Sequence, residues 1–248
     1  MPNKVNTINR QSCSATHTSK KQNGAVCKKK RRAEKKQKAA KSAEHSSVVT
    51  KVTEGKALLG DASLRVLLMS ENFALAASLA MNWEAADKLV ATAPANEFGN
   101  ASVEAEDDDA EVIQAFGGCV LHGVNTTALH VSMEVRQQAH TLGGAFERIV
   151  FDCLPKCSAG SASECQALLS GCFKSVLKSR LLAKAAQSRT AGQLHVILTA
   201  AAAAEWGVVT LAAAAGLRVH SPARPLELQG YEPPCGTADA VVYAFVEL

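Results

Sequence analysis

Apolar residues follow two alternating patterns along the chain from about residue 64 onward. Short continuous apolar runs are typical of buried strands, and they lie at 64–69, 89–93, 119–124, 146–151, 193–198, 217–219 and 241–246. Between these runs the apolar residues recur at helical spacing, which predicts helices at 72–79, 110–116, 163–186 and 205–215. Strands that alternate with helices predict an α/β fold with a doubly wound, mostly parallel sheet.

Local signals indicate where several of these elements begin and end. Asn72 is predicted as the N-cap of the first helix. Residues 96–109 are predicted as a polar loop, whose closing acidic run favours the N-terminus of the helix that follows. Gly216 is expected to end the last helix. The final apolar run comes after a loop rich in Pro and Gly at 222–236, which suits an antiparallel strand placed within the sheet.

A ligand in such a sheet binds beyond the carboxyl ends of the strands, where the strand order reverses. The positions at which a site is expected are therefore 69–73, 93–97, 123–127 and 151–156.

Composition supports a folded body. The chain has 248 residues, of which 47% are hydrophobic, and this excludes a wholly disordered protein. No run of about 18 uncharged apolar residues is present, so no membrane span is predicted. The eight cysteines form no Cys-x-x-Cys pair, and the Cys153–Cys157 spacing has no matching partner pair, so reduced thiols are expected and no metal site.

Charge divides the chain into a basic arm, residues 1–60, and an acidic body, residues 61–248. Residues 1–56 hold 15 Lys and Arg against 3 Glu, a net charge of +12, whereas 57–248 carry a net charge of −8. The arm lacks aromatic residues and apolar periodicity, so it is expected to be disordered by itself.

The basic cluster of the arm suits the neutralisation of RNA phosphates and also resembles a nuclear or nucleolar address. A solubilising tail and a mitochondrial presequence are alternatives, so mitochondrial or cytoplasmic localisation stays open beside the nucleolar one. The residues predicted to contact RNA are Lys28, Lys29, Lys30, Arg31, Arg32, Lys35 and Lys36.

Several runs of the body resemble the eukaryotic uridine-N3 large-subunit rRNA methyltransferase-like family. Residues 69–76 read Met-Ser-Glu-Asn-Phe-Ala-Leu-Ala, and the family motif is Gly-Glu-Gly-Asn-Phe-Ser-Phe-Ala. Residues 122–129 are similar to its His-Gly-Val-Asp-Ala-Thr-x-Leu, and residues 146–152 to its Phe-Asp-Arg-Ile-Ile-Phe-Asn. Weaker matches follow in the family's order, as far as Gly230-Tyr231.

The resemblance implies a Rossmann-like methyltransferase sheet that transfers a methyl group from S-adenosylmethionine to N3 of a uridine in ribosomal RNA, within a pre-ribosomal particle. Asp152, at the end of the fourth strand, is the candidate base for the N3 proton. The alternative for Asp152 is a strand-end aspartate that caps the next turn. The residues implied to bind the cofactor are Ser70, Glu71, Asn72, Phe73, Glu97 and Asn125.

The chain also departs from the family. Met69 and Glu71 replace two glycines that let the backbone approach the cofactor, and Glu71 adds a negative charge there. Ala95 replaces the acid expected to bind ribose, for which Glu97 could substitute, and Asn125 replaces a second acid. Two functions therefore fit: a diverged enzyme, or a catalytically inactive RNA-binding factor in ribosome assembly. Methyl transfer to a small molecule or a protein is a third, disfavoured by the basic arm.

Four aromatic or imidazole side chains have competing interpretations. Trp206 and Tyr231 could stack on an unstacked base, although packing is the more frequent role of such residues. His122 and His195 lie within apolar runs and are expected to be hydrogen-bonded core residues.

Overall fold

The computed structural model describes residues 58–94, 103–157, 161–184, 191–232 and 239–248. The predicted RNA contacts at 28–36 and the predicted ribose ligand Glu97 lie outside these ranges, as does nearly all of the arm.

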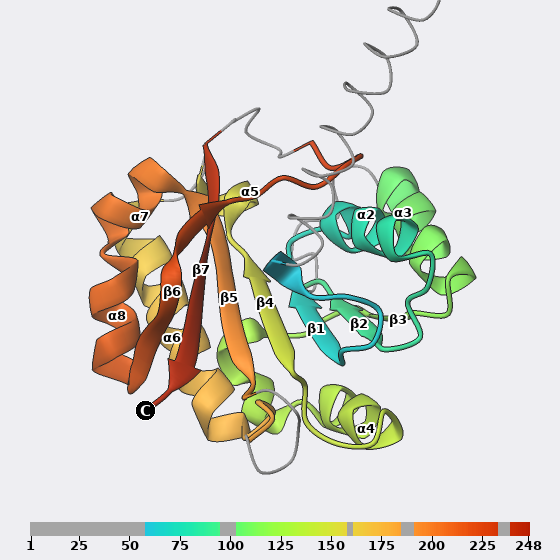
Figure 1. Cartoon of the computed structure of the whole chain (residues 1–248), viewed down its shortest axis with the longest axis horizontal. Coiled ribbons are helices and arrows are strands. Elements are labelled where there is room, and N and C mark those ends of the chain that lie inside the picture. The colour runs from blue at the N-terminus through green and yellow to red at the C-terminus, as the bar shows by residue number, and fades with distance from the viewer. Residues whose placement is uncertain (1–57, 95–102, 158–160, 185–190, 233–238) are drawn as a thin grey trace, which may run out of the picture. The chain divides into compact units, whose positions relative to one another are not determined.

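The described residues form a seven-stranded sheet with the order β3-β2-β1-β4-β5-β7-β6 (Figure 1). β1 to β5 are parallel to one another, whereas β7 lies between β5 and β6 and is antiparallel to both. This architecture confirms the predicted α/β class, with a mostly parallel sheet and an antiparallel strand near the C-terminus. The strands are β1 (Val66–Met69), β2 (Leu89–Thr92), β3 (Cys119–Leu121), β4 (Arg148–Asp152), β5 (Gln193–Thr199), β6 (Leu217–Pro225) and β7 (Ala240–Glu247).

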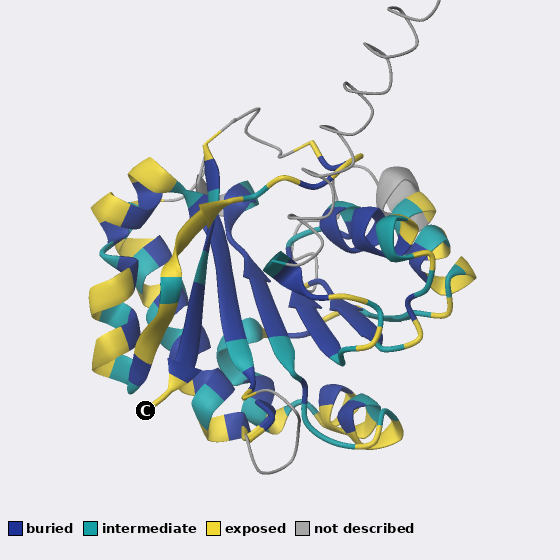
Figure 2. Ribbon diagram, in the orientation of Figure 1, coloured by how far each residue is buried: buried dark blue, intermediate teal, exposed yellow. Residues whose placement is uncertain are grey.

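Helices cover both faces of the sheet because the strands are apolar on both sides, and Figure 2 shows the central strands buried. Leu67 and Met69 join the core beneath α6, while Val66 and Leu68 join the core beneath α2. The helices are α2 (Ala74–Trp83), α3 (Val103–Ala115), α4 (Met133–Thr141), α5 (Leu154–Cys157), α6 (Ala162–Ser179), α7 (Ala200–Trp206) and α8 (Val208–Ala215), with a 3₁₀ segment η1 (Thr126–Val131).

Several predicted helix boundaries are wrong, and the structure gives the reasons. α3 begins at Val103, so the acidic run at 106–109 lies inside the helix and not in a loop before it. α6 ends at Ser179 because Arg180 takes a left-handed conformation with φ 57°. The helix predicted at 205–215 is two helices, since the chain turns at Gly207 with φ 63°. Gly216 ends α8 as predicted.

Further differences concern the turns. The N-cap of α2 is Phe73, and Asn72 instead accepts a hydrogen bond through Oδ1 from the Ala74 amide at 3.3 Å. η1 and α4 were not predicted. β6 extends to Pro225 through part of the predicted loop, because an edge strand tolerates residues that cannot donate a backbone hydrogen bond.

Candidate functional site

The sheet has one switch point, the place between β1 and β4 from which the chain continues to opposite sides. Met69 and Phe151 are paired at the ends of these strands, so Ser70 and Asp152 emerge side by side. The Ser70 hydroxyl donates a hydrogen bond to Asp152 Oδ2 at 3.0 Å. Two of the four predicted site positions therefore meet at one carboxylate.

Asp152 is a buried acid with three hydrogen-bond donors. Its residue is only 2% exposed. Besides Ser70, the Tyr231 hydroxyl donates to Oδ2 at 3.2 Å and the Leu154 amide donates to Oδ1 at 3.0 Å. The bond from Leu154 also fits the capping role considered for this aspartate.

Burial and charge set the protonation of this acid. Burial raises the pKa of Asp152 to about 6, and the negative charge of Glu71 acts in the same direction, whereas the three donors oppose the rise. Asp152 is therefore mostly ionised at neutral pH, and it takes up a proton when the pH falls toward 6. Such a pKa, close to the working pH, is what a general base requires.

Tyr231 reaches Asp152 from a segment that we call the strap, residues 226–232, which follows β6. The strap is tied to α2 by two hydrogen bonds: Ser78 Oγ donates to the Gly230 carbonyl at 3.1 Å, and Asn82 Nδ2 donates to the Gln229 carbonyl at 2.7 Å. The chain turns at Gly230 with φ 78°. Tyr231 itself is 9% exposed.

Sequence reasoning gave Tyr231 a stacking or packing role and missed its contact with Asp152. The contact joins residues 79 positions apart, and the only sequence signal was the place of Gly230-Tyr231 in the order of family motifs.

The turns after β1 and β3 also meet. The ring of Phe73, fully buried, lies edge to face with the imidazole of His122, with centroids 5.1 Å apart and planes at 86°. His122 is exposed, so its predicted core role is wrong; β3 ends at Leu121, one residue earlier. Asn125 caps η1, and its Oδ1 accepts hydrogen bonds from the amide and the hydroxyl of Thr127 at 2.9 and 2.8 Å.

Backbone hydrogen bonds link the strand ends into one edge. The Ser70 amide donates to the Thr92 carbonyl at 3.1 Å, and the Val124 amide donates to the Ala93 carbonyl at 3.1 Å. The hydroxyl of Thr92 is buried at this edge and has no hydrogen-bond partner among the described residues. It is a polar atom that a bound molecule could satisfy.

The two residues that replace the glycines of the family motif lie in different surroundings. Met69 is fully buried in the core beneath α6. Glu71 is partly exposed and close enough to Asp152 to raise its pKa. Of the two changes, the one at position 71 is therefore the one whose charge acts on Asp152.

Other candidate residues lie in the core. His195 is 2% exposed, and its Nε2 is 3.0 Å from Gln193 Oε1, which confirms the expected buried and hydrogen-bonded role. Burial, together with the charges of Arg148 and His220, lowers the pKa of His195 to about 3. Trp206 is 4% exposed and packs in the core cluster beneath α6, in agreement with the packing interpretation.

No group of three or more His, Cys, Asp or Glu within the described ranges could hold a metal ion. None of the described helices is long and apolar enough to cross a membrane. Among the described residues, Cys119 and Cys172 are free of disulfides.

Comparison with protein families identifies the family of this chain. Residues 67–232 match the model of the BMT5-like family, described as rRNA (uridine-N3-)-methyltransferase BTM5-like. This range begins within β1 and ends with the strap, so it contains Ser70, Asp152 and Tyr231. No curated protein matches the chain.

Proposed function

Because this chain belongs to the BMT5-like family of rRNA uridine-N3 methyltransferases, we propose that it transfers a methyl group from S-adenosylmethionine to N3 of a uridine in large-subunit ribosomal RNA. The observation that carries this proposal is the Asp152 carboxylate, held by Ser70 and Tyr231 at the switch point of the sheet. We also propose that the protein acts in the nucleolus on pre-ribosomal particles, to which its basic arm would bind.

The edge formed by the strand ends fits a cofactor of this kind. Ser70, Glu71, Asn72 and Phe73 form the turn after β1, and Asn125 follows β3 beside it. Because Oδ1 of Asn125 is engaged by Thr127, the side-chain amide nitrogen is the atom that would donate to an adenine ring. The buried Thr92 hydroxyl offers a further polar contact. When bound, S-adenosylmethionine supplies an electrophilic methyl group on its sulfonium.

Asp152 would supply the base for the reaction. As the N3–CH₃ bond forms, the S–CH₃ bond would break and leave neutral S-adenosylhomocysteine. The N3–H bond of uridine must break as well, and its proton would pass to the Asp152 carboxylate, which would then hold it as a neutral acid. Its pKa of about 6 leaves the acid largely ionised at pH 7 and so able to accept that proton. Because the carboxyl is closed to solvent, the uridine reaches it only if a neighbour moves. Tyr231, 3.2 Å away on the strap, is the neighbour that we expect to give way.

A second function is favoured by Glu71. By the family resemblance its charge would lie near the carboxylate of a bound methionine moiety, and it already raises the pKa of Asp152. A relative that kept the fold and lost the cofactor would act as a catalytically inactive RNA-binding factor in ribosome assembly.

Titration of the full chain with S-adenosylmethionine and S-adenosylhomocysteine separates the two functions. Saturable binding at micromolar ligand, followed by formation of N3-methyluridine in pre-ribosomal RNA measured by nucleoside mass spectrometry, is the expected result. Absence of both binding and a thermal shift at millimolar ligand would rule out the enzyme.

Variants that restore the family's glycines at positions 69 and 71 also distinguish the two functions. If the chain is an active enzyme, the native protein already binds the cofactor with Met69 and Glu71 in place. In an inactive relative, Glu71→Gly should create binding that the native chain lacks, and Glu84→Gly, an exposed glutamate at the end of α2, is the control.

A further inference from the structure

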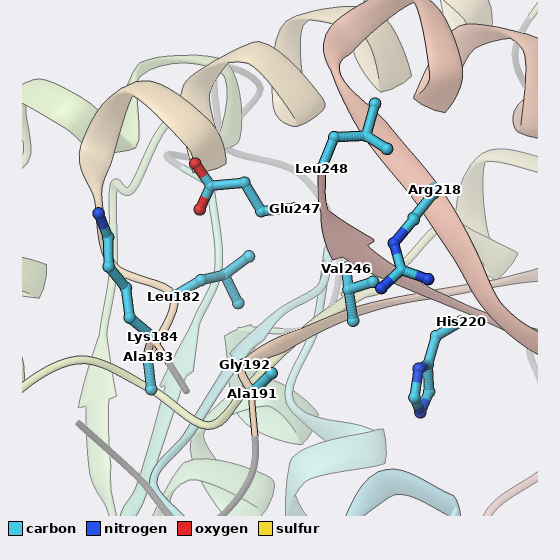
Figure 3. Close-up of a pocket in the computed structure, with 10 residues that line it drawn as sticks. All are labelled: Leu182, Ala183, Lys184, Ala191, Gly192, Arg218, His220, Val246, Glu247 and Leu248. Carbon is cyan, nitrogen blue, oxygen red and sulfur yellow. The ribbon is translucent and has the colours of Figure 1, made fainter. Parts of the chain in front are cut away.

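A cavity of about 440 Å³ lies at the opposite end of the sheet from Asp152. Its walls come from the chain just before β5, the beginning of β6 and the end of β7 (Figure 3). Asp152 pairs with Ile197 of β5, while Gly192 of the cavity precedes that strand. Five residues of strand separate the two places, a distance of about 16 Å.

The charged side chains of the cavity are mostly basic. Arg218 and His220 project from β6 on one side of the view in Figure 3, and Lys184 and Glu247 lie on the other side. Glu247 is the only acidic side chain in this lining. An adjoining cavity of about 260 Å³ shares Lys184 and Glu247 and adds Arg180.

Glu247 offsets part of the positive charge of this lining, but it forms no ion pair with the basic groups within the described ranges. Arg180, Lys184, Arg218 and His220 are all exposed, and within the described ranges no ion pair or side-chain hydrogen bond engages them. The single ion pair of the described residues joins Arg65 to Glu147. The positive charge of the cavity is therefore available to an anionic ligand.

The charge of the surroundings makes this cluster unusual. Residues 57–248 carry a net charge of −8, so basic side chains would not gather at one place by composition alone. The same end of the sheet holds Arg148, and the charges of Arg148 and His220 both lower the pKa of the buried His195. Arg148 itself has the negative charges of Glu147 and Asp61 near it, so the positive charge of this end is that of the basic side chains that line the cavity.

We propose that this cavity binds phosphate groups of the RNA backbone, with Arg218 and Lys184 as the main contacts. The proposal rests on the proposed function, in which RNA is the substrate. A guanidinium can donate two parallel hydrogen bonds to one phosphate, and a lysine adds a point charge. A backbone contact of this kind fixes the position of the RNA without reading its sequence. The body would then hold the RNA at a point remote from the methylated base, independently of the arm.

The test measures binding of the full chain to a fluorescently labelled single-stranded 12-nucleotide RNA over a range of NaCl concentrations. Arg218→Gln and Lys184→Gln should each lower the slope of log Kd against log salt by about one, and weaken binding about five- to tenfold near 0.1 M salt. Glu247→Gln should strengthen binding, since it removes the acid of the lining.

Arg224→Gln is the matched control, because Arg224 is an exposed arginine on the same strand that does not line the cavity. It should leave both the affinity and the slope nearly unchanged. An equal loss in Arg218→Gln and Arg224→Gln would overturn the proposal, since it would mean diffuse attraction to the strand.

Inorganic phosphate alone distinguishes a backbone site from a site for a small phosphate. In the full chain with ¹³C-labelled histidine, His220→Asn identifies the His220 signal by its loss. RNA should shift this signal at much lower concentration than inorganic phosphate does. Saturation by phosphate with no response to RNA would overturn the proposal.

Failure of this site and failure of the proposed function give different results. If the cavity variants bind RNA like the native chain while S-adenosylmethionine still binds, only the cavity proposal is wrong. If the native chain binds no RNA, both are wrong.

Discussion

Asp152 combines burial with three hydrogen-bond donors, and these two influences act on its pKa in opposite directions. Burial has the larger effect, so the folded protein holds the proton to a higher pH than the unfolded chain does. Asp152 therefore makes a pH-dependent contribution to the stability of the fold.

Asp152→Asn should remove this dependence. The pKa of Asp152 is about 6 in the fold against an ordinary value of 3.8. At this side chain the folded state therefore binds more protons between these values, and the contribution of Asp152 to the free energy of unfolding falls as the pH rises from about 4 to 6. We expect the free energy of unfolding of the native protein, minus that of the variant, to fall by about 1–3 kcal/mol as the pH rises across this range. Above about pH 6 this difference should stay level.

Urea unfolding of both proteins between pH 4 and 7 measures this difference, with Asp87→Asn at an exposed aspartate as the control. A difference that does not change with pH would contradict the raised pKa.

Tyr231→Phe should move the pKa of Asp152 upward. The hydroxyl stabilises the ionised carboxylate, so its loss should raise this pKa by about one unit. The acidic limb of the pH profile of methyl transfer should then shift to higher pH, while the affinity for S-adenosylmethionine stays the same.

A ¹³C titration of the Asp152 carboxyl measures the same shift without activity. Tyr243→Phe, which removes a hydroxyl from a ring stacked on Phe245 in β7, is the control. Identical titrations of the native and Tyr231→Phe proteins would exclude the expected role of the hydroxyl.

Sequence reasoning placed Asp152 correctly at the end of a strand, because an apolar run followed by an acid is a local pattern. It could not assign the hydroxyl of Tyr231 to this acid, since the contact depends on a turn at Gly230 and on two hydrogen bonds from α2. It also placed His122 in the core, because an apolar run does not reveal where a strand ends.

At the scale of elements, the sheet depends on a close approach of two backbone segments just before β5. The Gly192 amide donates to the Ala183 carbonyl at 2.7 Å, and the Ala183 amide donates to the Phe146 carbonyl at 2.8 Å. A Cβ at position 192 would lie 2.7 Å from the Ala183 nitrogen and 2.8 Å from its oxygen. Only glycine fits without a shift of the backbone.

Gly192→Ala should therefore destabilise the fold by about 2–4 kcal/mol, because the atoms in conflict belong to the backbone and cannot rotate away. Urea unfolding at pH 7 measures the loss. Ala191→Ser, at the exposed neighbouring position, should change the stability by less than about 0.5 kcal/mol. A stable Gly192→Ala protein would mean that the segment at 183 can move aside.

At the scale of the whole molecule, the opposite charges of the arm and the body divide the proposed tasks. Residues 1–56 carry a net charge of +12, whereas the body is negative, so the arm should dominate the attraction to RNA. The body supplies the switch point and the proposed phosphate cavity. We therefore expect that removal of the arm leaves the proposed cofactor binding intact.

Deletion of residues 1–56 should weaken RNA binding, reduce its salt dependence and abolish nucleolar accumulation, while S-adenosylmethionine binding stays unchanged. Anisotropy titrations and fluorescence microscopy follow the two effects separately. Deletion of residues 1–27 is the control, because it keeps the basic cluster at 28–36. If neither RNA affinity nor localisation changes, the arm has neither role.

The sequence by itself determined the class of the fold and the four strand ends at which a site is expected, because alternating apolar runs and helical periodicity are local properties of the chain, whereas the strand order that places the switch point between β1 and β4 came from the tertiary structure. The sequence also determined the charge division and, through motifs in order, the family. Only the tertiary structure decided which side chains meet: Ser70, Asp152 and Tyr231 at one end of the sheet, and Lys184, Arg218 and His220 at the other. These groups come from segments far apart in the chain, and the pairing of strands brings them together.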